Sequence, residues 1–404
     1  MALKTQNLSS VGIAPSLPFV SQHVNGTEQS ALQILYKTDW DFCDATTNGA
    51  THSFHPYPAR FIPQIPAVLI RAFTKLGETI YDPFVGGGTS CVEANIVGRH
   101  ALGGDANGLA VLIARAKSCP PAKGSTAAIL QTAIHAKRQA ENLNNKVTAP
   151  ALSVEWFDDF IIREIAAIKQ AITGLQGASE REFCFVALSA ILIGVSKQDS
   201  DTRYVRVPKN LSPGDAIVRY ERQLRKMLRL MDLCRADLLR GMTDVRVADS
   251  RIPGTFADDS ADFVVTSPPY PNAYDYHLYH RHRLLWLDMD PAELKQQEIG
   301  AHAHYSRRNG PDENDFRRDM ERVFRASSRI LKRGRYFALV VGDSILHGRR
   351  VRNRDIVKDA AYVAGFTSVI DFRRRMNSRR KSFNPAHGNI HTEDIVILRN
   401  DRRQ

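Results

Sequence analysis

The chain has 404 residues, a formal net charge of +12 and a sequence pI of about 9.5. Its length suits one large domain or two ordinary ones, and its apolar content of 43% is enough for a substantial hydrophobic core. The positive charge is compatible with a polyanionic partner, nucleic acid first, and equally with a generic basic enzyme.

The cysteines and the apolar segments argue against several other classes of protein. The five cysteines are scattered and form no Cys-x-x-Cys pair, so neither a zinc site nor a disulfide framework is expected. Such cysteine usage favours a reducing, intracellular compartment. The most apolar window, Phe183 to Val195, is too short to cross a bilayer, and the N-terminal sequence lacks the design of a secretory signal. We therefore expect no membrane association.

The N-terminal third begins with a polar stretch and then alternates helix and strand. Residues 1–50 are rich in Ser, Thr, Asn and Gln, and we expect a loosely ordered arm. Residues 51–118 form the next unit, since short apolar runs there end at acidic residues and are separated by helical patterns. The expected elements are a helix over Phe61–Lys75, a strand over Thr79–Tyr81 ending at Asp82, a helix from about Thr89, and a strand over Ala101–Gly104 ending at Asp105. Strand, helix and strand joined by short loops predict a parallel sheet.

The middle of the chain, residues 119–240, is expected to be a helical insertion without strands. Two apolar series recur at helical spacing, one from Ile161 to Leu175 and one from Ile217 to Leu238. A polar loop, Ser196–Tyr204, separates them. Recognition of a partner and bracing of the fold both stay open as roles for this insertion.

The α/β pattern resumes over residues 241–404. The expected strands lie near Val245–Val247, Phe263–Val265, Tyr336–Val341, Thr367–Phe372 and Ile395–Leu398, and the expected helices near Phe316–Leu331 and Val351–Ala364. Gly342-Asp343-Ser344 would end a strand at the same sheet edge as Asp82, where it either lines a pocket or caps the following segment.

A glycine-rich turn, Asp82-Pro-Phe-Val-Gly-Gly-Gly-Thr89, joins the first strand to a helix. Glycines there let the backbone approach a ligand closely, and the start of the helix offers free N–H donors. A phosphate-binding P-loop is excluded because no Gly-Lys-Ser/Thr follows. Asp105 stands at the end of the next strand, where an acid can bind ribose hydroxyls in a doubly wound fold. These features together predict a nucleoside-type cofactor.

The stretch Thr266-Ser-Pro-Pro-Tyr270 follows an apolar run, so it lies where a buried strand ends. Two consecutive prolines fix two φ angles and remove two backbone donors. The resulting rigid rim can hold a flat, amino-bearing group. Ser267 and the Pro268 carbonyl would accept hydrogen bonds from the amine, and Tyr270 would stack on the ring. A turn or a proline-rich recognition segment is the alternative for such a motif taken alone.

The two motifs together resemble those of the amino-group DNA methyltransferases, which use S-adenosylmethionine (SAM). In that family Asp-Pro-Pro-Tyr or Asn-Pro-Pro-Tyr usually marks adenine-N6 enzymes, and Ser-Pro-Pro-Tyr usually marks cytosine-N4 enzymes. The segment His55–Arg60 resembles the family segment that covers the methionine part of the cofactor, and Asp249 resembles its acidic residue near the cofactor adenine. The resemblance covers about Thr51–Ala116 and Val245–Asn400.

The resemblance implies an α/β, Rossmann-like SAM-dependent methyltransferase fold with a mainly parallel sheet and a helical insertion. It implies Ser267, Pro268, Pro269 and Tyr270 as catalytic residues. It implies cofactor-binding roles for Tyr57, Pro58, Asp82, Phe84, Gly86, Gly88, Thr89, Asp105, Asp249 and Thr266. The cofactor is SAM, and no metal is expected. The setting it implies is the cytoplasm of a prokaryote, with a cognate restriction endonuclease as a candidate partner.

The resemblance implies double-stranded DNA as the substrate, and its target base must be flipped out because an amine inside a duplex cannot reach the cofactor. Aromatic residues interleaved with His and Arg over Tyr274–Arg283 suit a flipped base and its phosphates. Six further cations between two expected strands suit phosphates as well. The expected DNA-binding residues are Tyr274, Arg281, Arg283, Arg373, Arg374, Arg375, Arg379, Arg380 and Lys381. The leading hypothesis for the function is cytosine-N4 methylation of DNA. The alternatives are adenine-N6 methylation of DNA, methylation of an RNA base, and a DNA-binding protein without enzymatic activity.

Overall fold

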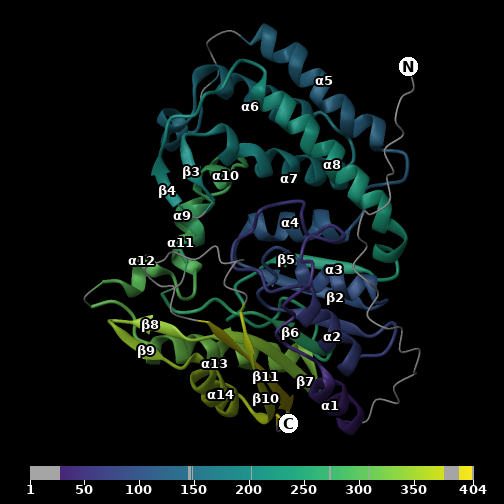
Figure 1. The fold of residues 1–404 in the computed structure, drawn as a ribbon, viewed down its shortest axis with the longest axis vertical. Helices are drawn as coiled ribbons and strands as arrows, with labels where there is room; N and C mark the ends of the chain where they lie inside the picture. The colour runs from purple at the N-terminus through teal and green to yellow at the C-terminus, as the bar shows by residue number, and fades with distance from the viewer. Residues whose placement is uncertain are drawn as a thin grey trace, which may run out of the picture.

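The computed structural model describes residues 28–143, 147, 149–201, 203–272, 274–307, 309–376 and 391–402. A seven-stranded sheet passes through one part of the molecule, and a group of helices lies at the end opposite β10 and β11 (Figure 1). The strands of the sheet are β1 (Thr79–Asp82), β2 (His100–Asp105), β5 (Thr243–Val247), β6 (Ala261–Thr266), β7 (Leu331–Gly342), β10 (Phe366–Arg375) and β11 (Thr392–Asn400).

The order of the strands is β10-β11-β7-β6-β1-β2-β5. Parallel pairs join β5, β2, β1, β6 and β7, whereas β11 runs antiparallel to both β7 and β10. This is the Rossmann-like methyltransferase sheet, so the predicted fold class is confirmed. Because five neighbouring strands are parallel, their carboxyl ends, including Asp82, Asp105 and Thr266, meet at one edge.

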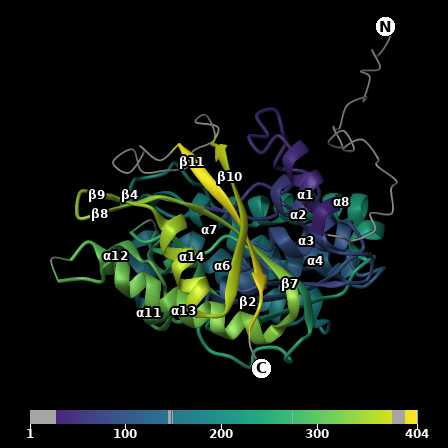
Figure 2. The same cartoon turned by 90° about the horizontal axis from the view of Figure 1, so that it is seen from below.

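Helices cover both faces of the sheet. The helices α2 (Gln64–Phe73), α3 (Thr89–Ile96) and α4 (Gly108–Ser118) lie on one face, and α13 (Glu313–Ile330) and α14 (Asn353–Val363) on the other (Figure 2). Strand β6 is buried along its whole length, which explains its continuous apolar sequence. Side chains alternate between the two faces along this strand. Phe263 and Val265 pack in the core on the side of α2, α3 and α4, and Val264 packs in the core on the side of α13 and α14.

The insertion is helical as predicted. Its helices α5 (Thr126–Asn142), α6 (Asp159–Thr173), α7 (Ala178–Val195) and α8 (Asp215–Leu238) bury the two apolar series in a core that continues into α4. The expectation of no strands was wrong, because the polar loop forms the hairpin of β3 (Gln198–Ser200) and β4 (Arg203–Arg206). A short 3-10 turn, Ala151–Trp156, precedes α6. Across the described ranges, no helix has both the length and the apolar character that crossing a membrane requires.

The expectation of a loosely ordered arm was wrong for its second half. Residues 28–37 form helix α1 (Glu28–Lys37), and Leu35 is fully buried against the sheet-facing core. The ring of Trp40 packs beside Phe372 of β10, with the ring centroids 5.8 Å apart. The apolar side chains of a short amphipathic segment were enough to order it, although its overall composition is polar.

The remaining short elements lie on the left side of the molecule in Figure 1. They are α9 (Tyr276–Tyr279), α10 (Arg281–Trp286), α11 (Pro291–Gln297), α12 (His302–Tyr305), β8 (Ser344–Leu346) and β9 (Arg349–Val351). Strands β8 and β9 form a separate antiparallel hairpin.

Gly88 tests how tightly the glycine-rich turn packs. Its φ is +76°, and an added Cβ would lie 2.6 Å from Cα of Ala114. Gly88→Ala is expected to lower the free energy of unfolding by about 3 kcal/mol, since left-handed backbone costs about 1 kcal/mol and the overlap about 2 kcal/mol. Urea unfolding measures this difference.

Gly77 provides the matched control, because its φ is +77° and an added Cβ would meet nothing within 4 Å. Gly77→Ala should cost only the backbone part, about 1 kcal/mol. Equal losses in the two variants would contradict a packing role for Gly88.

Candidate active site

A pocket opens at the carboxyl edge of the parallel strands. Its lining comes from several parts of the chain that are distant in sequence. These are Tyr57 with residues 59–61, Phe84 to Gly87 with Thr89, Asp105 to Asn107, Asp249 with Ser250, Ser267 with Pro269, Tyr276, and Leu294 with residues 297–299. The glycine-rich turn and the Ser-Pro-Pro-Tyr loop therefore border the same pocket.

The Asp82 carboxylate connects these two loops. Its Oδ1 accepts hydrogen bonds from Thr266 Oγ1 (2.6 Å) and from the Phe84 amide (3.0 Å), and its Oδ2 accepts one from Ser90 Oγ. Burial raises the pKa of Asp82 to about 6. Thr266 is itself buried and absent from the lining, so the structure places it as a brace for Asp82 rather than at the pocket surface.

The glycine-rich turn forms one wall of the pocket. Gly86 and Gly87 line it, and the Gly86 amide donates to Oδ2 of Asp105 (2.9 Å). Gly88 lies behind the wall against Ala114, as its close approach shows. The fully buried Lys117 donates from Nζ to the Gly87 carbonyl (2.8 Å) and so fixes the turn from below.

Asp105 faces the pocket from the end of β2. Its Oδ1 accepts from the Asn107 amide (2.9 Å), and burial raises the pKa of Asp105 to about 6. Asp249 lines the pocket too, but its carboxylate forms an ion pair with Arg251 (2.8 Å). Burial by itself would raise the pKa of Asp249. The hydrogen bonds and the positive charge of Arg251 outweigh burial, so the pKa lies below its usual value.

The segment around Tyr57 covers the pocket opposite the sheet. The Tyr57 ring stacks on Tyr276 (5.7 Å between centroids) and on His280 (5.1 Å). Pro58 is buried and absent from the lining, whereas Phe84 and Thr89 line the pocket. His55 contacts Ser189 of α7 at 2.9 Å, so the insertion holds this segment in place.

In the Ser-Pro-Pro-Tyr loop, only Ser267 and Pro269 line the pocket. The Ser267 hydroxyl donates to the Val340 carbonyl of β7 (3.3 Å). The Tyr270 hydroxyl lies 3.3 Å from Glu393 of β11 and 3.5 Å from Val340 O, so the phenol end is held by the sheet. Pro268 is buried beneath the loop.

The expected DNA-binding residues after this loop separate into two environments. Tyr274 is buried, and its ring lies 5.8 Å from that of Tyr276. Arg281 is partly exposed, with its guanidinium 5.8 Å from the Tyr204 ring centroid. Arg283 is 0% exposed, pairs with Asp201 and donates to the Ser189 carbonyl (3.0 Å). The expectation that Arg283 contacts phosphate was therefore wrong, since a helix packed on α7 encloses it.

The histidines of the same run serve different neighbours. His277 pairs with Glu298, and His282 contacts Ser153 Oγ at 3.0 Å. His280 lies under Tyr57. Within the residues described, no group of three His, Cys, Asp or Glu side chains could hold a metal ion.

The basic loop also differs from expectation. Arg373, Arg374 and Arg375 belong to strand β10 and not to a loop. Arg374 is buried, pairs with Glu393 and donates to the Trp40 carbonyl (2.9 Å), while Arg373 pairs with Asp394 (2.9 Å). The longer strand reflects pairing with β11 through Arg375 and Thr392. Arg379, Arg380 and Lys381 lie outside the described residues.

Several residues of the site escaped the sequence analysis. Tyr276, Gln297 and Glu298 line the pocket without belonging to either motif, and Ser90 completes the contacts of Asp82. The interleaved aromatic run was a signal for Tyr276, whereas nothing local distinguishes Glu298.

Comparison with known proteins agrees with this geometry. Residues 18–115 match a family model described as DNA methylase, that of the N6 and N4 methyltransferases. This part of the chain is similar to the N6/N4 DNA methylase family. The matched segment contains both Tyr57 and the glycine-rich turn.

Two curated relatives and one solved structure are similar to this chain. A type II methyltransferase, M.MvaI from Kocuria varians, is 27% identical over 300 residues, which are 66% of this chain and 65% of that protein. Another, M.MjaII from Methanocaldococcus jannaschii, is 32% identical over 87 residues, 20% of this chain and 16% of that protein. The chain thus spans less than two thirds of the length of either relative. A SAM-dependent methyltransferase structure from Methanosarcina mazei aligns with a TM-score of 0.35 and 10% identity, covering 86% of this chain and 100% of that one.

The cofactor of the methylase family is SAM, and the pocket of this chain fits it. Gly86, with a φ of +48°, and Gly87 offer a backbone wall without side chains. Asp105 supplies carboxylate acceptors at the strand end, and Tyr57 and Phe84 supply aromatic surface.

Arg283→Ala tests whether this side chain has a structural role. Removing it leaves the Ser189 carbonyl and the Asp201 carboxylate without their partner, so the free energy of unfolding should fall by about 3 kcal/mol. Arg281→Ala is the control and should cost about 0.5 kcal/mol, because only partly exposed contacts with the ring and hydroxyl of Tyr204 are lost. Unchanged stability in Arg283→Ala, together with weakened DNA binding, would restore the phosphate role.

Proposed function

We propose that this protein is a site-specific DNA methyltransferase that transfers a methyl group from SAM to the N4 amine of a flipped cytosine. One observation carries the proposal. Ser267 and Pro269 border the same pocket as the glycine-rich turn, and the Asp82–Thr266 hydrogen bond fixes the two loops relative to each other.

The Ser267 hydroxyl is oriented to accept a hydrogen bond from an amine. Its hydrogen is directed to the Val340 carbonyl, which leaves the lone pairs of the oxygen for another donor. An amine that donates to Ser267 and to the Pro268 carbonyl becomes more pyramidal, and its nitrogen lone pair is freed from the ring. Positioning of this kind supplies much of the rate of a direct displacement.

When bound, SAM supplies a methyl group on a positively charged sulfur. Gly86, Gly87 and Asp105 would hold SAM in the pocket that Ser267 borders, and SAM would supply the methyl group that replaces a proton of the cytosine amine. Tyr270 supports the flipped base through its ring, while Glu393 and Val340 hold its hydroxyl.

Two related functions remain as alternatives. Adenine-N6 methylation uses the same acceptor geometry, and Ser267 in place of Asp or Asn is the feature that favours cytosine. An RNA base would fit the same loop. The type II names of both curated relatives favour DNA and a setting of restriction and modification, with a cognate endonuclease as partner and the prokaryotic cytoplasm as location.

The decisive experiment incubates the protein with labelled SAM and mixed genomic DNA or RNA, followed by mass spectrometry of the nucleosides. N4-methylcytosine in DNA is the expected product. N6-methyladenine would select the adenine alternative, and label in RNA alone would overturn the DNA assignment.

Variants of Tyr270 serve as controls in the same assay. Tyr270→Phe keeps the ring and loses only the contacts of the hydroxyl, so it should retain most activity. Tyr270→Ala should lose about a hundredfold or more, because base stacking is worth about 1–3 kcal/mol and positioning depends on it. Both should bind SAM normally, and full activity in Tyr270→Ala would contradict the assigned role.

The pocket also predicts a pH dependence of SAM binding. Asp105 has a pKa of about 6, so its carboxylate becomes protonated as the pH falls through this value. If the ionised form accepts the ribose hydroxyls, affinity should fall about tenfold between pH 7 and pH 5, as measured by calorimetry.

Asp105→Asn should bind SAM weakly and without this pH dependence. Asp82 shares a pKa of about 6, so a wild-type pH profile in Asp105→Asn would assign the effect to Asp82 instead.

A further inference from the structure

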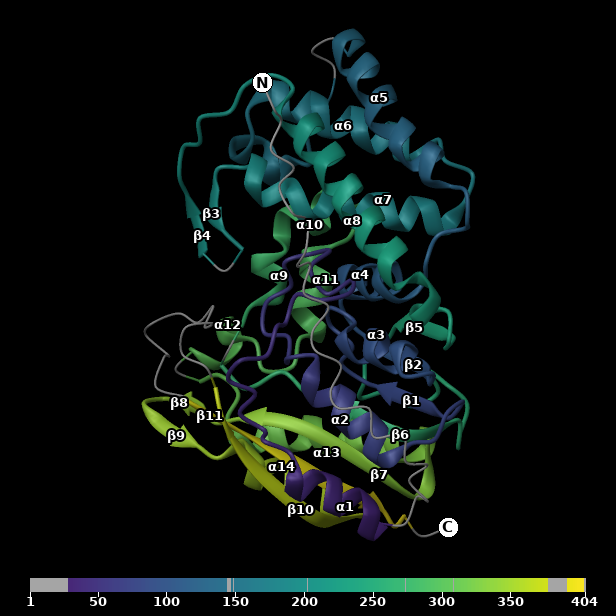
Figure 3. The same ribbon diagram turned by 45° about the vertical axis from the view of Figure 1, so that its right-hand side comes forward.

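The β8–β9 hairpin projects beside the Ser-Pro-Pro-Tyr loop. Its turn consists of His347 (φ +49°) and Gly348 (φ +78°), as in a two-residue type I′ turn. An added Cβ on Gly348 would meet nothing within 4 Å, so the tip is open. In Figure 1 and Figure 3 the hairpin lies on the same side of the molecule as α12 and the β3–β4 hairpin.

Hydrogen bonds from two asparagine side chains hold this hairpin to the candidate active site. Asn272, shortly after Tyr270, donates from Nδ2 to the Ile345 carbonyl of β8 (2.7 Å). The fully buried Asn353 donates from Nδ2 to the Gly342 carbonyl (2.8 Å) and to Ser344 Oγ (2.7 Å). Asp343 does not line the pocket, and its carboxylate pairs with Arg350 of β9 (2.8 Å).

The hairpin also carries cations that nearby acids do not neutralise. Arg349, Arg350 and Arg352 are all exposed. Arg350 is paired with Asp343, but Arg349 and Arg352 form no ion pair with any residue that the structure describes.

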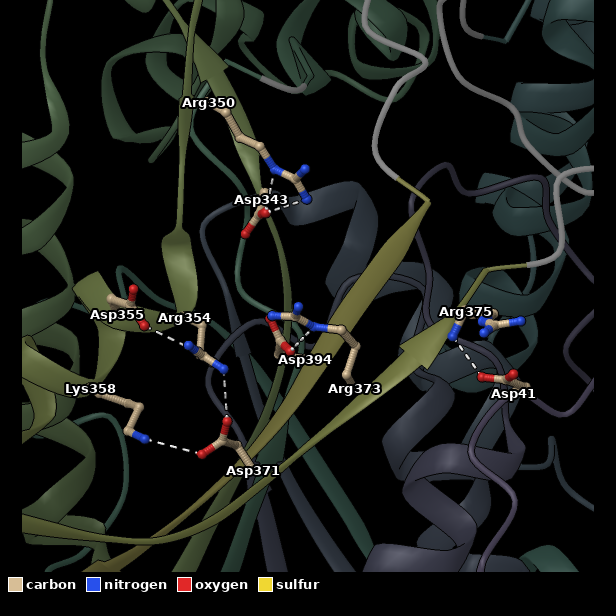
Figure 4. Close-up of polar contacts among 10 residues, drawn as sticks. All are labelled: Asp41, Asp343, Arg350, Arg354, Asp355, Lys358, Asp371, Arg373, Arg375 and Asp394. Carbon is tan, nitrogen blue, oxygen red and sulfur yellow. Dashed lines mark hydrogen bonds and ion pairs between the residues drawn. The ribbon is translucent and has the colours of Figure 1, made fainter.

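The acids of the adjoining sheet surface are already occupied (Figure 4). Asp371 pairs with Arg354 (3.0 Å) and Lys358 (3.1 Å), and Asp394 pairs with Arg373 (2.9 Å). The arginines of the other hairpin differ, because Arg203 pairs with Asp199 and Arg206 with Glu155. The β8–β9 hairpin is thus a rigid support for two available positive charges.

We propose that Arg349 and Arg352 bind backbone phosphates of duplex DNA next to the flipped base. This inference rests on the proposed function, because it takes DNA as the substrate. The contacts are independent of sequence, so they fix the orientation of the duplex over the Ser-Pro-Pro-Tyr loop and leave the choice of site to other residues.

The test measures binding of a labelled mixed-sequence duplex by fluorescence anisotropy at about 50 to 200 mM salt. Each phosphate contact contributes about 0.9 to the slope of log affinity against log salt, so Arg349→Ala/Arg352→Ala should lower that slope by about 1.8. Arg349→Lys/Arg352→Lys keeps the charges and should keep the slope. Lys137→Ala/Arg138→Ala is the matched control, since these exposed cations belong to α5. Helix α5 lies at the end of the molecule away from β8 and β9 (Figure 1).

An unchanged slope in Arg349→Ala/Arg352→Ala, or an equal drop in the α5 control, would overturn the proposal. SAM affinity, which should equal that of the wild type, verifies that the variant is folded. Methylation of DNA by the wild type is measured separately. If the wild type methylates DNA and the slope does not change, the hairpin proposal alone fails, whereas absence of DNA methylation by the wild type counts against the proposed function.

Discussion

The hydrogen bonds to Asp82 are the interactions on which the candidate site depends. This carboxylate lies at the end of β1. It accepts hydrogen bonds from the glycine-rich turn, from α3 and from the end of β6. Burying a carboxylate without partners would cost several kcal/mol, and the donors offset that cost. Since the donors come from both loops, the same contacts that make the buried acid tolerable also set the position of Ser267 relative to the SAM pocket.

The insertion supports the site from the other side. Its helices contact the segment that carries Tyr57, through His55 and Ser189, Gln223 and the Phe54 carbonyl, and Lys226 and the Ser53 carbonyl. The buried Arg283 adds a contact between α10 and α7. These contacts favour bracing as one role of the insertion, because they hold the aromatic cover over the glycine-rich turn.

The arginines show why a net charge does not locate a nucleic-acid surface. Arg283 and Arg374 are buried and use their planar donors to satisfy carboxylates and backbone carbonyls inside the protein. Arg349 and Arg352 stand in a similar basic run yet remain exposed. The difference lies in the elements that pack around each side chain, and only the exposed set can exchange water for phosphate.

The sequence by itself determined the parallel sheet, the glycine-rich turn, the acids at the strand ends and the Ser-Pro-Pro-Tyr loop. These features depend on local chemistry, namely strand periodicity, glycine at positive φ and proline after a buried strand. Tertiary structure alone decided that Thr266 braces Asp82, that Glu298 lines the pocket, that residues 28–37 are helical and that Arg373–Arg375 belong to a strand. Each of these outcomes depends on a partner far along the chain, as the separation of 184 residues between Asp82 and Thr266 illustrates. Local sequence specifies which groups are present, and packing of distant segments specifies which of them meet.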